Sequence, residues 1–199
     1  MVKHVHAAIR HIRSHADGYG VEGARIGLVG ISAGGQLATL SALNPMPPRP
    51  ESRDAWRRCG TEVRAVAAFC PPADLVDFGG HRLDRYHLEG LDVQGLLFRR
   101  GTVGHTDAEI IARLKDLSPM YVSAGFKEHH PGASLPPLLL VHGTADSLVP
   151  AEQSHRLQAA WQAAGGTAEL LLREGADHLW PDNDKELAHT SEWFVNYLL

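Results

Sequence analysis

The chain is poor in several features that mark specialised classes of protein. Two cysteines, Cys59 and Cys70, among 199 residues are too few for the disulfide framework of a small secreted domain. Cys70 ends an apolar run and is expected to be a small buried residue. The apolar runs reach only strand length, and the first six residues lack the apolar core of a signal peptide. The sequence therefore predicts a cytoplasmic protein without a membrane span.

An excess of positive charge is also absent. Lys and Arg number 19 against 23 Asp and Glu, the formal net charge is -4, and the basic residues are scattered. A nucleic-acid partner is not expected, because such proteins carry a basic patch or stripe. With 44% hydrophobic and 21% charged residues, the composition is that of an ordinary globular protein with room for a substantial core.

Histidine, by contrast, is abundant, with 13 residues, and invites a metal hypothesis. His11 and His15 stand four apart on a predicted helix, but no glutamate has the metalloprotease spacing and no third ligand is evident. His129 and His130 fall in a predicted loop. We expect a solvated helix face in the first case and an ordinary loop in the second, so neither a metal nor a cofactor is predicted.

The order of the hydrophobic patterns is that of an α/β domain. Apolar residues recur at helical spacing over residues 2–19, which predicts an amphipathic helix packed on a sheet. Four later runs are continuously apolar, as expected of parallel strands covered on both faces. The predicted strands span residues 24–30, 63–70, 137–142 and 168–173, with helices at 33–43, 151–164 and 185–198.

Residues 75–134 differ in character from the rest of the chain. They are rich in Gly, His and Arg around one short predicted helix, which begins with a capping box formed by Thr106 and Glu109. A long irregular insertion at the carboxyl ends of strands is where lids and substrate loops occur. We therefore expect a single domain over residues 1–199, with 75–134 as a lid or insertion region.

The sequence Gly-Ile-Ser-Ala-Gly at residues 30–34 has the pattern of a nucleophile elbow. It follows a predicted strand and opens a predicted helix, which is the context that this motif needs. In an elbow, strained backbone angles at a sharp turn expose the serine hydroxyl above the sheet. Side chains at Gly30 or Gly34 are expected to collide with the neighbouring strand or helix. Ser32 is thus a candidate nucleophile.

A serine nucleophile needs a base, and the base needs an acid that orients it. Asp146 follows the third predicted strand, and His178 follows the fourth. Since parallel strands bring their carboxyl ends to one edge of a sheet, Ser32, Asp146 and His178 are expected to converge there. Their order along the chain, Ser then Asp then His, is that of an α/β-hydrolase.

Other interpretations stand beside the triad. Asp177 competes for the role of the acid, but it adjoins His178 in sequence and is expected to point away and be solvated. Asp74 is a weaker rival and fits a helix cap. Taken alone, Asp146 would fit a turn equally well. Trp180 fits either the alcohol side of a substrate pocket or the core. Order, spacing and strand placement together favour Ser32, Asp146 and His178.

With these motifs the chain resembles the carboxyl-terminal part of an α/β-hydrolase of the esterase/lipase type. It is most similar to the acetyl- and feruloyl-esterase-like group, which is related to prolyl oligopeptidase catalytic domains. The resemblance runs from residue 8 to 35 and from 136 to 150, including the block His142-Gly143-Thr144-Ala145-Asp146. It departs at Glu22-Gly23, where the family often has Asp-Pro, a change expected to affect only a turn.

The resemblance implies a partial α/β-hydrolase fold, with a mostly parallel sheet of about four strands and helices on both faces. It also implies Ser32 as the nucleophile, His178 as the base and Asp146 as the orienting acid. Members of the family begin with further strands and a His-Gly-Gly-Gly-type loop that donates to the oxyanion. Here only the Ala33 N–H is expected in the oxyanion hole, since the Gly79-Gly80-His81 sequence falls in the wrong place.

The missing strands predict an exposed sheet edge and, through it, self-association. A start codon upstream of Met1 would supply both the strands and the loop.

Three candidate functions follow from the sequence. The first is a serine esterase that cleaves small esters with a short acyl group, such as acetyl, through an acyl-enzyme. The second is a truncated or weakened hydrolase fragment that binds a ligand or a partner chain. The third is a prolyl-oligopeptidase-like peptidase, which the lack of an encoded propeller disfavours. Retention of all three triad positions favours the esterase.

Overall fold

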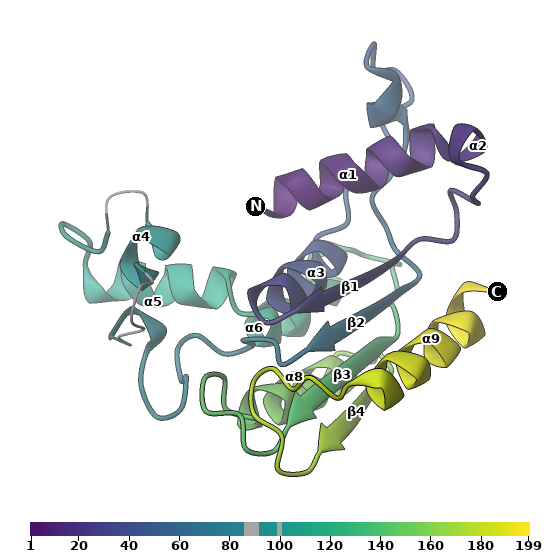
Figure 1. The fold of residues 1–199 in the computed structure, drawn as a ribbon. Helices are drawn as coiled ribbons and strands as arrows, with labels where there is room; N and C mark the ends of the chain where they lie inside the picture. Colours follow the sequence, from purple (N-terminus) through teal and green to yellow (C-terminus); the bar gives the residue numbers. More distant parts are fainter. Residues whose placement is uncertain (86–91, 99–100) are drawn as a thin grey trace.

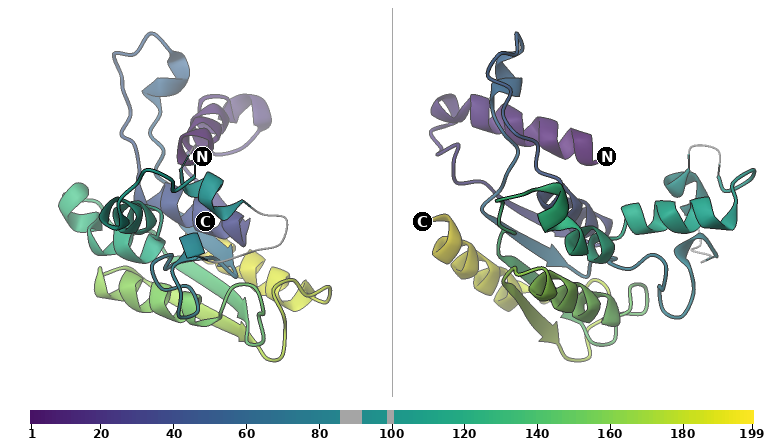
Figure 2. Two further views of the ribbon diagram at one scale, coloured as in Figure 1. Left: turned by 90° about the vertical axis from the view of Figure 1, so that its left-hand side faces the viewer. Right: turned by 180° about the vertical axis from the view of Figure 1, so that it is seen from behind.

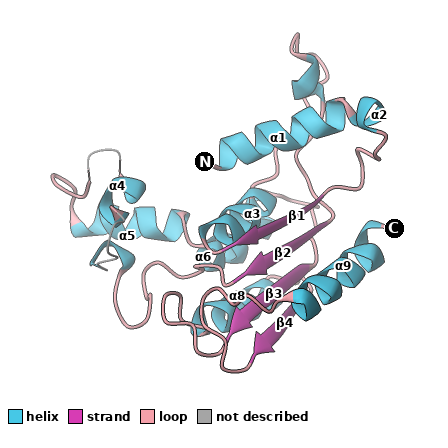
Figure 3. Ribbon diagram, in the orientation of Figure 1, coloured by secondary structure: helices cyan, strands magenta, loops and turns pink. Residues whose placement is uncertain are grey.

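The computed structural model describes residues 1–85, 92–98 and 101–199 (Figure 1). Within them the chain forms a four-stranded, fully parallel sheet in the order β1-β2-β3-β4. The strands are β1 (Gly27–Ile31), β2 (Ala65–Phe69), β3 (Leu138–Gly143) and β4 (Ala168–Arg173). All four were predicted from their apolar runs. The sheet thus has one edge at which the four carboxyl ends meet (Figure 3).

Helices cover both faces of this sheet, as predicted. On one face α3 (Ala33–Leu43) and α8 (Glu152–Ala163) pack against the strands, and α6 (Pro119–Ala124) lies between these two helices. The C-terminal helix α9 (Asp184–Leu198) lies on the opposite face (Figure 1). This is the three-layer arrangement of a partial α/β-hydrolase fold.

Side chains of the central strands alternate between two apolar clusters, one in each layer. In β2, Val66 and Ala68 join the cluster beneath α3 and α8, whereas Ala67 and Phe69 join the cluster beneath α9. Trp193 is the buried residue that α9 contributes. Every residue of β2 and β3 is buried, which explains their unbroken apolar sequences.

The prediction that every strand is covered on both faces is wrong for the edge strands. Val29 and Ile31 of β1 are 60% and 50% exposed, and Leu172 of β4 is 41% exposed. In the described part of the chain, α9 reaches the start of β1, where Phe194 fills the space beside Gly27, but it does not extend over Val29 and Ile31. Strand β1 therefore presents apolar side chains on one face of the sheet, and in the described part of the chain it pairs with β2 alone.

The N-terminal helix also differs from its prediction. Instead of one helix over residues 2–19, the structure has α1 (Val2–Ser14) and α2 (Ala16–Tyr19), because His15 leaves the helical conformation with φ -119° and ψ 17°. The main partners of α1 are α3 and the short 3-10 helix η1 (Ala55–Arg58), rather than the sheet. Figure 2 shows α1 beyond α3, far from β3 and β4.

The segment after β2 holds more helix than the single short one predicted. It contains η2 (Leu83–Arg85), α4 (Val93–Leu97), α5 (Asp107–Asp116), α6 and α7 (Phe126–His129). The predicted capping box of α5 is confirmed, because the Thr106 N–H donates to Glu109 Oε2 at 2.7 Å and the Glu109 N–H to Thr106 Oγ1 at 3.3 Å. His129 ends α7, so the loop predicted for His129 and His130 is wrong for the first residue and correct for the second.

This segment has an apolar cluster of its own, separate from the two beneath the sheet. Its buried members are Leu75, Val93, Leu97, Ile110 and Leu114. Residues 86–91 and 99–100 of the predicted insertion lie outside the described residues. None of the helices that the structure describes combines the length and hydrophobicity of a bilayer span, and the cytoplasmic location stays a prediction.

Candidate active site

Ser32 occupies the sharp turn between β1 and α3, where its backbone has φ 54° and ψ -125°. Positive φ is strained for a residue with a side chain, and such strain concentrates at functional sites. The Ser32 N–H donates to the carbonyl of Phe69 in β2 at 2.8 Å, and the Ser32 carbonyl accepts from Gln36 N at 3.0 Å. The turn is therefore anchored to the neighbouring strand and to the first turn of α3, which is the geometry of a nucleophile elbow.

Two glycines allow β1 and α3 to approach at this turn. A Cβ on Gly30 would overlap the Gly34 backbone, and a Cβ on Gly35 would lie 3.1 Å from the Gly30 carbonyl and 3.3 Å from Ala68 Cβ. Gly34 itself has open space where a Cβ would be, so the steric role predicted for it is wrong. Gly30 and Gly35 are therefore the positions of this turn at which a side chain would not fit.

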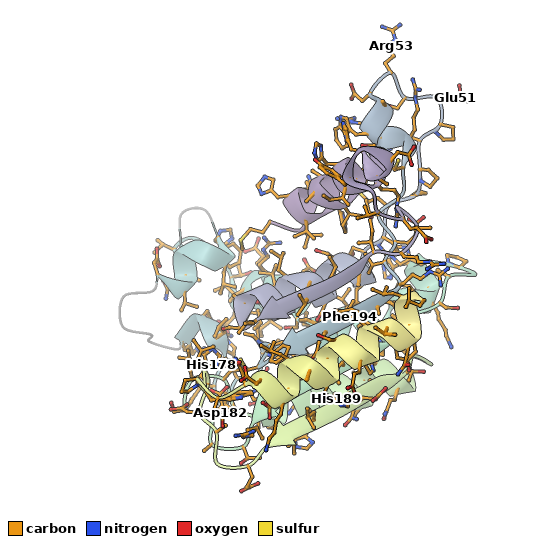
Figure 4. All side chains as sticks on the ribbon, turned by 45° about the vertical axis from the view of Figure 1, so that its right-hand side comes forward. Glu51, Arg53, His178, Asp182, His189 and Phe194 are labelled. Carbon is orange, nitrogen blue, oxygen red and sulfur yellow. The ribbon has the colours of Figure 1, made fainter. Side chains whose placement is uncertain are left out.

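The structure brings the three residues proposed from sequence into one hydrogen-bonded chain. His178 Nε2 lies 2.9 Å from Ser32 Oγ, and His178 Nδ1 lies 2.8 Å from Asp146 Oδ2. Because a carboxylate only accepts, Nδ1 carries the imidazole hydrogen and Nε2 is left to accept from the serine hydroxyl. Figure 4 shows His178 in the loop that precedes α9, at the carboxyl ends of the strands.

Asp146 is held by its own loop as well as by His178. Its side chain is fully buried, and Oδ1 accepts the N–H groups of Leu148 at 2.9 Å and Val149 at 2.8 Å. The two interpretations of Asp146, turn former and partner of the histidine, are thus both correct, one for each carboxylate oxygen. A further side chain, that of His142, places Nε2 3.1 Å from Asp146 Oδ2.

Asp177 is exposed, but it is not merely solvated as predicted. Its Oδ1 accepts the Ser147 N–H at 2.8 Å and the His178 N–H at 2.7 Å, and Ser147 Oγ donates to the same carboxylate. The hydrogen bonds from Ser147 and His178 lower the pKa of Asp177. This carboxylate therefore ties the loop of the acid to the loop of the base without contacting the imidazole.

Asp74, the other rival for the acid, closes a turn instead of capping a helix. Its Oδ1 accepts the N–H groups of Val76 and Asp77 at 3.0 Å each, and no helix begins at this point of the described chain. Its Oδ2 pairs with Arg156 of α8 at 3.0 Å. Asp74 thus fastens the start of the insertion to α8, and its predicted role as a helix cap is wrong.

Cys70, which follows β2, lies beside the site as the buried residue that the sequence predicts. Its Sγ–H donates to the carbonyl of His178 at 3.3 Å, and burial raises the pKa of the thiol to about 11. Cys70 therefore supports the backbone of His178 as a protonated thiol.

Trp180 packs at the edge of the cluster beneath α9, which favours the core interpretation of that residue.

Among the described residues, one group of side chains could hold a metal ion, and it overlaps the site around Ser32. Cys70, Asp146 and His178 each offer one atom, all within 4.8 Å of one another. Two of these residues are committed to the hydrogen-bonded chain with Ser32, and the thiol is protonated. His11 and His15 are exposed, with ring centroids 4.4 Å apart, and His11 Nε2 lies 3.1 Å from the Tyr19 hydroxyl.

Ala33 is the first residue of α3, so its N–H has no acceptor within the helix. It directly follows Ser32 in the chain. The Gly80 N–H, by contrast, donates to Asp77 Oδ1 at 2.9 Å. Of the two, only the Ala33 N–H adjoins Ser32, and its role as an oxyanion donor stays a prediction.

The family follows from a match over most of the chain. The family model described as BD-FAE matches residues 1–161. The chain belongs to the BD-FAE family. The matched part includes the elbow and Asp146 and ends within α8, before the loop that carries His178. Together with the fold, membership of the BD-FAE family places this chain among the α/β-hydrolases of the esterase type.

Individual relatives agree with the BD-FAE assignment. The chain is 26% identical to a "Probable isoprenylcysteine alpha-carbonyl methylesterase" of Arabidopsis thaliana, over 89% of this chain and 35% of that protein. Among solved structures it is similar to the butyrate-bound esterase Est2 of Thermogutta terrifontis, with a TM-score of 0.65 and 30% identity over 98% of this chain and 64% of that one. A truncated carbohydrate esterase from gut microbiota superposes with a TM-score of 0.74 at 22% identity, covering 98% of this chain and 67% of that chain, and shows the shared fold. The chain spans less than half the length of the curated relatives that it matches.

His142 is the site residue to which the sequence analysis gives no role. It lies in β3, within an otherwise apolar run, and is completely buried. A lone histidine among fully buried aliphatic residues is a usable signal, because a buried polar group needs a hydrogen-bond partner. The sequence does not show that this partner is Asp146.

Proposed function

We propose that this chain carries the catalytic groups of a serine hydrolase that cleaves carboxylic esters. The observation that supports it is the continuous chain of hydrogen bonds from Ser32 through His178 to Asp146, with the serine on a strained turn. Each contact falls within the 2.6–3.2 Å range expected of a nucleophile and its base. The relatives named as esterases support the same reaction class.

In the proposed reaction, Ser32 Oγ attacks the ester carbonyl carbon while His178 Nε2 accepts the hydroxyl proton. The tetrahedral intermediate then collapses, the carbon–oxygen bond to the alcohol breaks, and His178 returns the proton to the departing alcohol. Water repeats the sequence on the acyl-enzyme, releasing the acid and restoring Ser32. Asp146 keeps Nδ1–H directed away from the serine and stabilises the imidazolium formed in each half-reaction.

The Ala33 N–H is proposed to stabilise the oxyanion. Hydrolases of this fold use a second N–H from a loop after another strand, and loss of one such donor costs about 10²–10³ in rate.

Short acyl groups are the proposed substrates. One similar solved structure is an esterase that was determined with butyrate, a short acyl group, bound. The segment at residues 75–134 is proposed as a lid over this site. Its described part is joined to the elbow helix, since Gln36 Nε2 of α3 donates to the Leu117 carbonyl at 2.8 Å.

A second proposal concerns association through the free edge of β1. Val29 and Ile31 are exposed on this strand, and an uncovered edge strand is a template for pairing with another chain. Sedimentation velocity should show self-association that Val29→Lys reduces, because a charge on an edge strand opposes pairing. Lysine at Val103, which is also exposed and lies in the insertion rather than on a strand, is the matched control.

The serine-esterase proposal is tested with p-nitrophenyl acetate, butyrate and octanoate. Ser32→Ala should abolish hydrolysis above background, and Ser191→Ala, which removes an exposed hydroxyl from α9, should leave the rate unchanged. A fluorophosphonate probe should add to the peptide that contains Ser32 and to no other. Equal rates for the unaltered chain and Ser32→Ala would contradict the proposal.

A further inference from the structure

We propose that His142 is a positioning residue, which holds the Asp146 carboxylate so that Oδ2 faces the imidazole of His178. The inference rests on the proposed function and adds a second histidine to it. His142 lies near the end of β3, four residues before Asp146, and its side chain is 0% exposed. Its Nε2 lies 3.1 Å from the same carboxylate oxygen that accepts from His178.

The neighbours of His142 determine which of its nitrogens carries hydrogen. Nε2 lies 2.9 Å from the Val149 carbonyl as well as 3.1 Å from Asp146 Oδ2. Both of these groups only accept, so Nε2 carries the hydrogen; it donates to the Val149 carbonyl, and the Asp146 oxygen lies beside the same N–H. Nδ1 lies 2.6 Å from Ser154 Oγ, whose hydroxyl supplies the remaining hydrogen. Burial lowers the pKa of His142, which favours this neutral form.

The donor from His142 completes the hydrogen bonding of the buried carboxylate. Asp146 Oδ1 accepts from Leu148 and Val149, Oδ2 accepts from His178, and His142 Nε2 lies 3.1 Å from the same Oδ2. An ionised carboxylate offers about four acceptor sites, so the N–H of His142 is the group that faces the remaining one. Without His142, Oδ2 would keep the contact to His178 alone, and one side of a fully buried charge would lose its partner.

The contacts of His142 also close a ring that fixes the loop of the acid. Val149 donates its N–H to Asp146 Oδ1 and accepts through its carbonyl from His142 Nε2. Ser154, on the other side of the imidazole, belongs to α8. His142 thus connects the end of β3, the loop that carries Asp146 and the start of α8. The orientation of Asp146 is set by these three elements together.

Two substitutions separate the nitrogen that faces Asp146 from the one that faces Ser154. In His142→Gln, the amide nitrogen reaches the place of Nε2 and keeps a donor for Asp146 and Val149. In His142→Asn, the shorter amide reaches only the place of Nδ1 and keeps the contact with Ser154. Both variants introduce a buried amide, so a purely structural role of His142 would affect them alike.

With p-nitrophenyl acetate, His142→Asn should lower kcat by about tenfold to a hundredfold with KM changed less than about threefold, because a misplaced base slows only the chemical steps. His142→Gln should recover most of kcat. A kcat for His142→Asn equal to that of the unaltered chain, or equal losses in both variants, would overturn the proposal.

A second measurement does not depend on turnover. The proton between His178 Nδ1 and Asp146 Oδ2 should give a low-field proton resonance in the unaltered chain and in His142→Gln, and this resonance should broaden or vanish in His142→Asn. Retention of the same resonance in His142→Asn would also overturn the proposal. If the unaltered chain hydrolyses no ester, the serine-esterase function fails, whereas the resonance still decides the role of His142.

Discussion

Gly143 and Ala176 approach so closely that a methyl group on Gly143 would overlap the Ala176 carbonyl. Gly143 ends β3 just before the loop of Asp146, and Ala176 lies two residues before His178. The same carbonyl accepts the Ala145 N–H at 3.0 Å. The distance between the proposed acid and base is therefore set by backbone contact between two loops, and the absence of a side chain at Gly143 permits it.

Gly143→Ala should accordingly separate the two loops. We expect kcat for short aryl esters to fall by about tenfold or more, since a shift of about 1 Å at a base has effects of this size. Gly18→Ala is the matched control, because Gly18 lies in α2 with no atom within 4 Å of the place of a Cβ. An unchanged kcat in Gly143→Ala would show that the loops can separate without harm.

The elbow glycines should differ in their effect on stability. Gly30→Ala forces overlap with the Gly34 backbone and should lower the free energy of unfolding by about 1–3 kcal/mol or more. Gly34→Ala meets open space within α3 and should be neutral or slightly stabilising. Urea denaturation followed by circular dichroism measures both. Equal losses in the two variants would contradict this account of the turn.

Asp177 gives a prediction for the dependence of stability on pH. Its pKa is lowered in the folded chain, so its contribution to stability is present above the unfolded pKa of about 4 and is lost as pH falls through the folded pKa. Asp177→Asn should therefore lower Tm near pH 7, and the difference from the unaltered chain should shrink below about pH 4. A difference in Tm that is constant from pH 7 to pH 3 would count against the hydrogen bonds to Ser147 and His178 as its source.

Cys70 should resist alkylation in the folded chain. With a pKa of about 11 and almost no exposure, it is protonated and shielded at pH 8. Cys59 is only half-buried and serves as an internal control in the same molecule. Iodoacetamide followed by mass spectrometry of the peptides should show modification at Cys59 before Cys70, with the difference removed in denaturant. Equal rates at both positions without denaturant would contradict the buried position of Cys70.

The sequence predicts the frame of the sheet well because the signals are local. Buried parallel strands read as unbroken apolar runs, as in Leu138–Val141, and their carboxyl ends share one edge, which is why Ser32, Asp146 and His178 could be expected to meet. The exposure of Val29 is not a local property, since it depends on how far α9 extends over β1.

Other features depend on contacts that no pattern encodes. The interruption of the first helix at His15 lies inside a continuous helical pattern, and Asp177 differs from a solvated carboxylate only because Ser147 comes to it from another loop. His142 is another residue that the sequence predicts only in part. Its burial follows from its place in an apolar strand, whereas its contact with Asp146 depends on the direction in which the chain turns after β3.

The hydrogen bond between Ser32 and His178 joins residues 146 positions apart, and this separation has a kinetic consequence. Contacts between distant residues form late in folding, because the chain between them must be ordered first. Here β4 must pair with β3 before the loop of His178 can reach Ser32. During refolding, reactivity of Ser32 toward a fluorophosphonate should thus return after the helical signal, and its appearance would time the completion of the sheet.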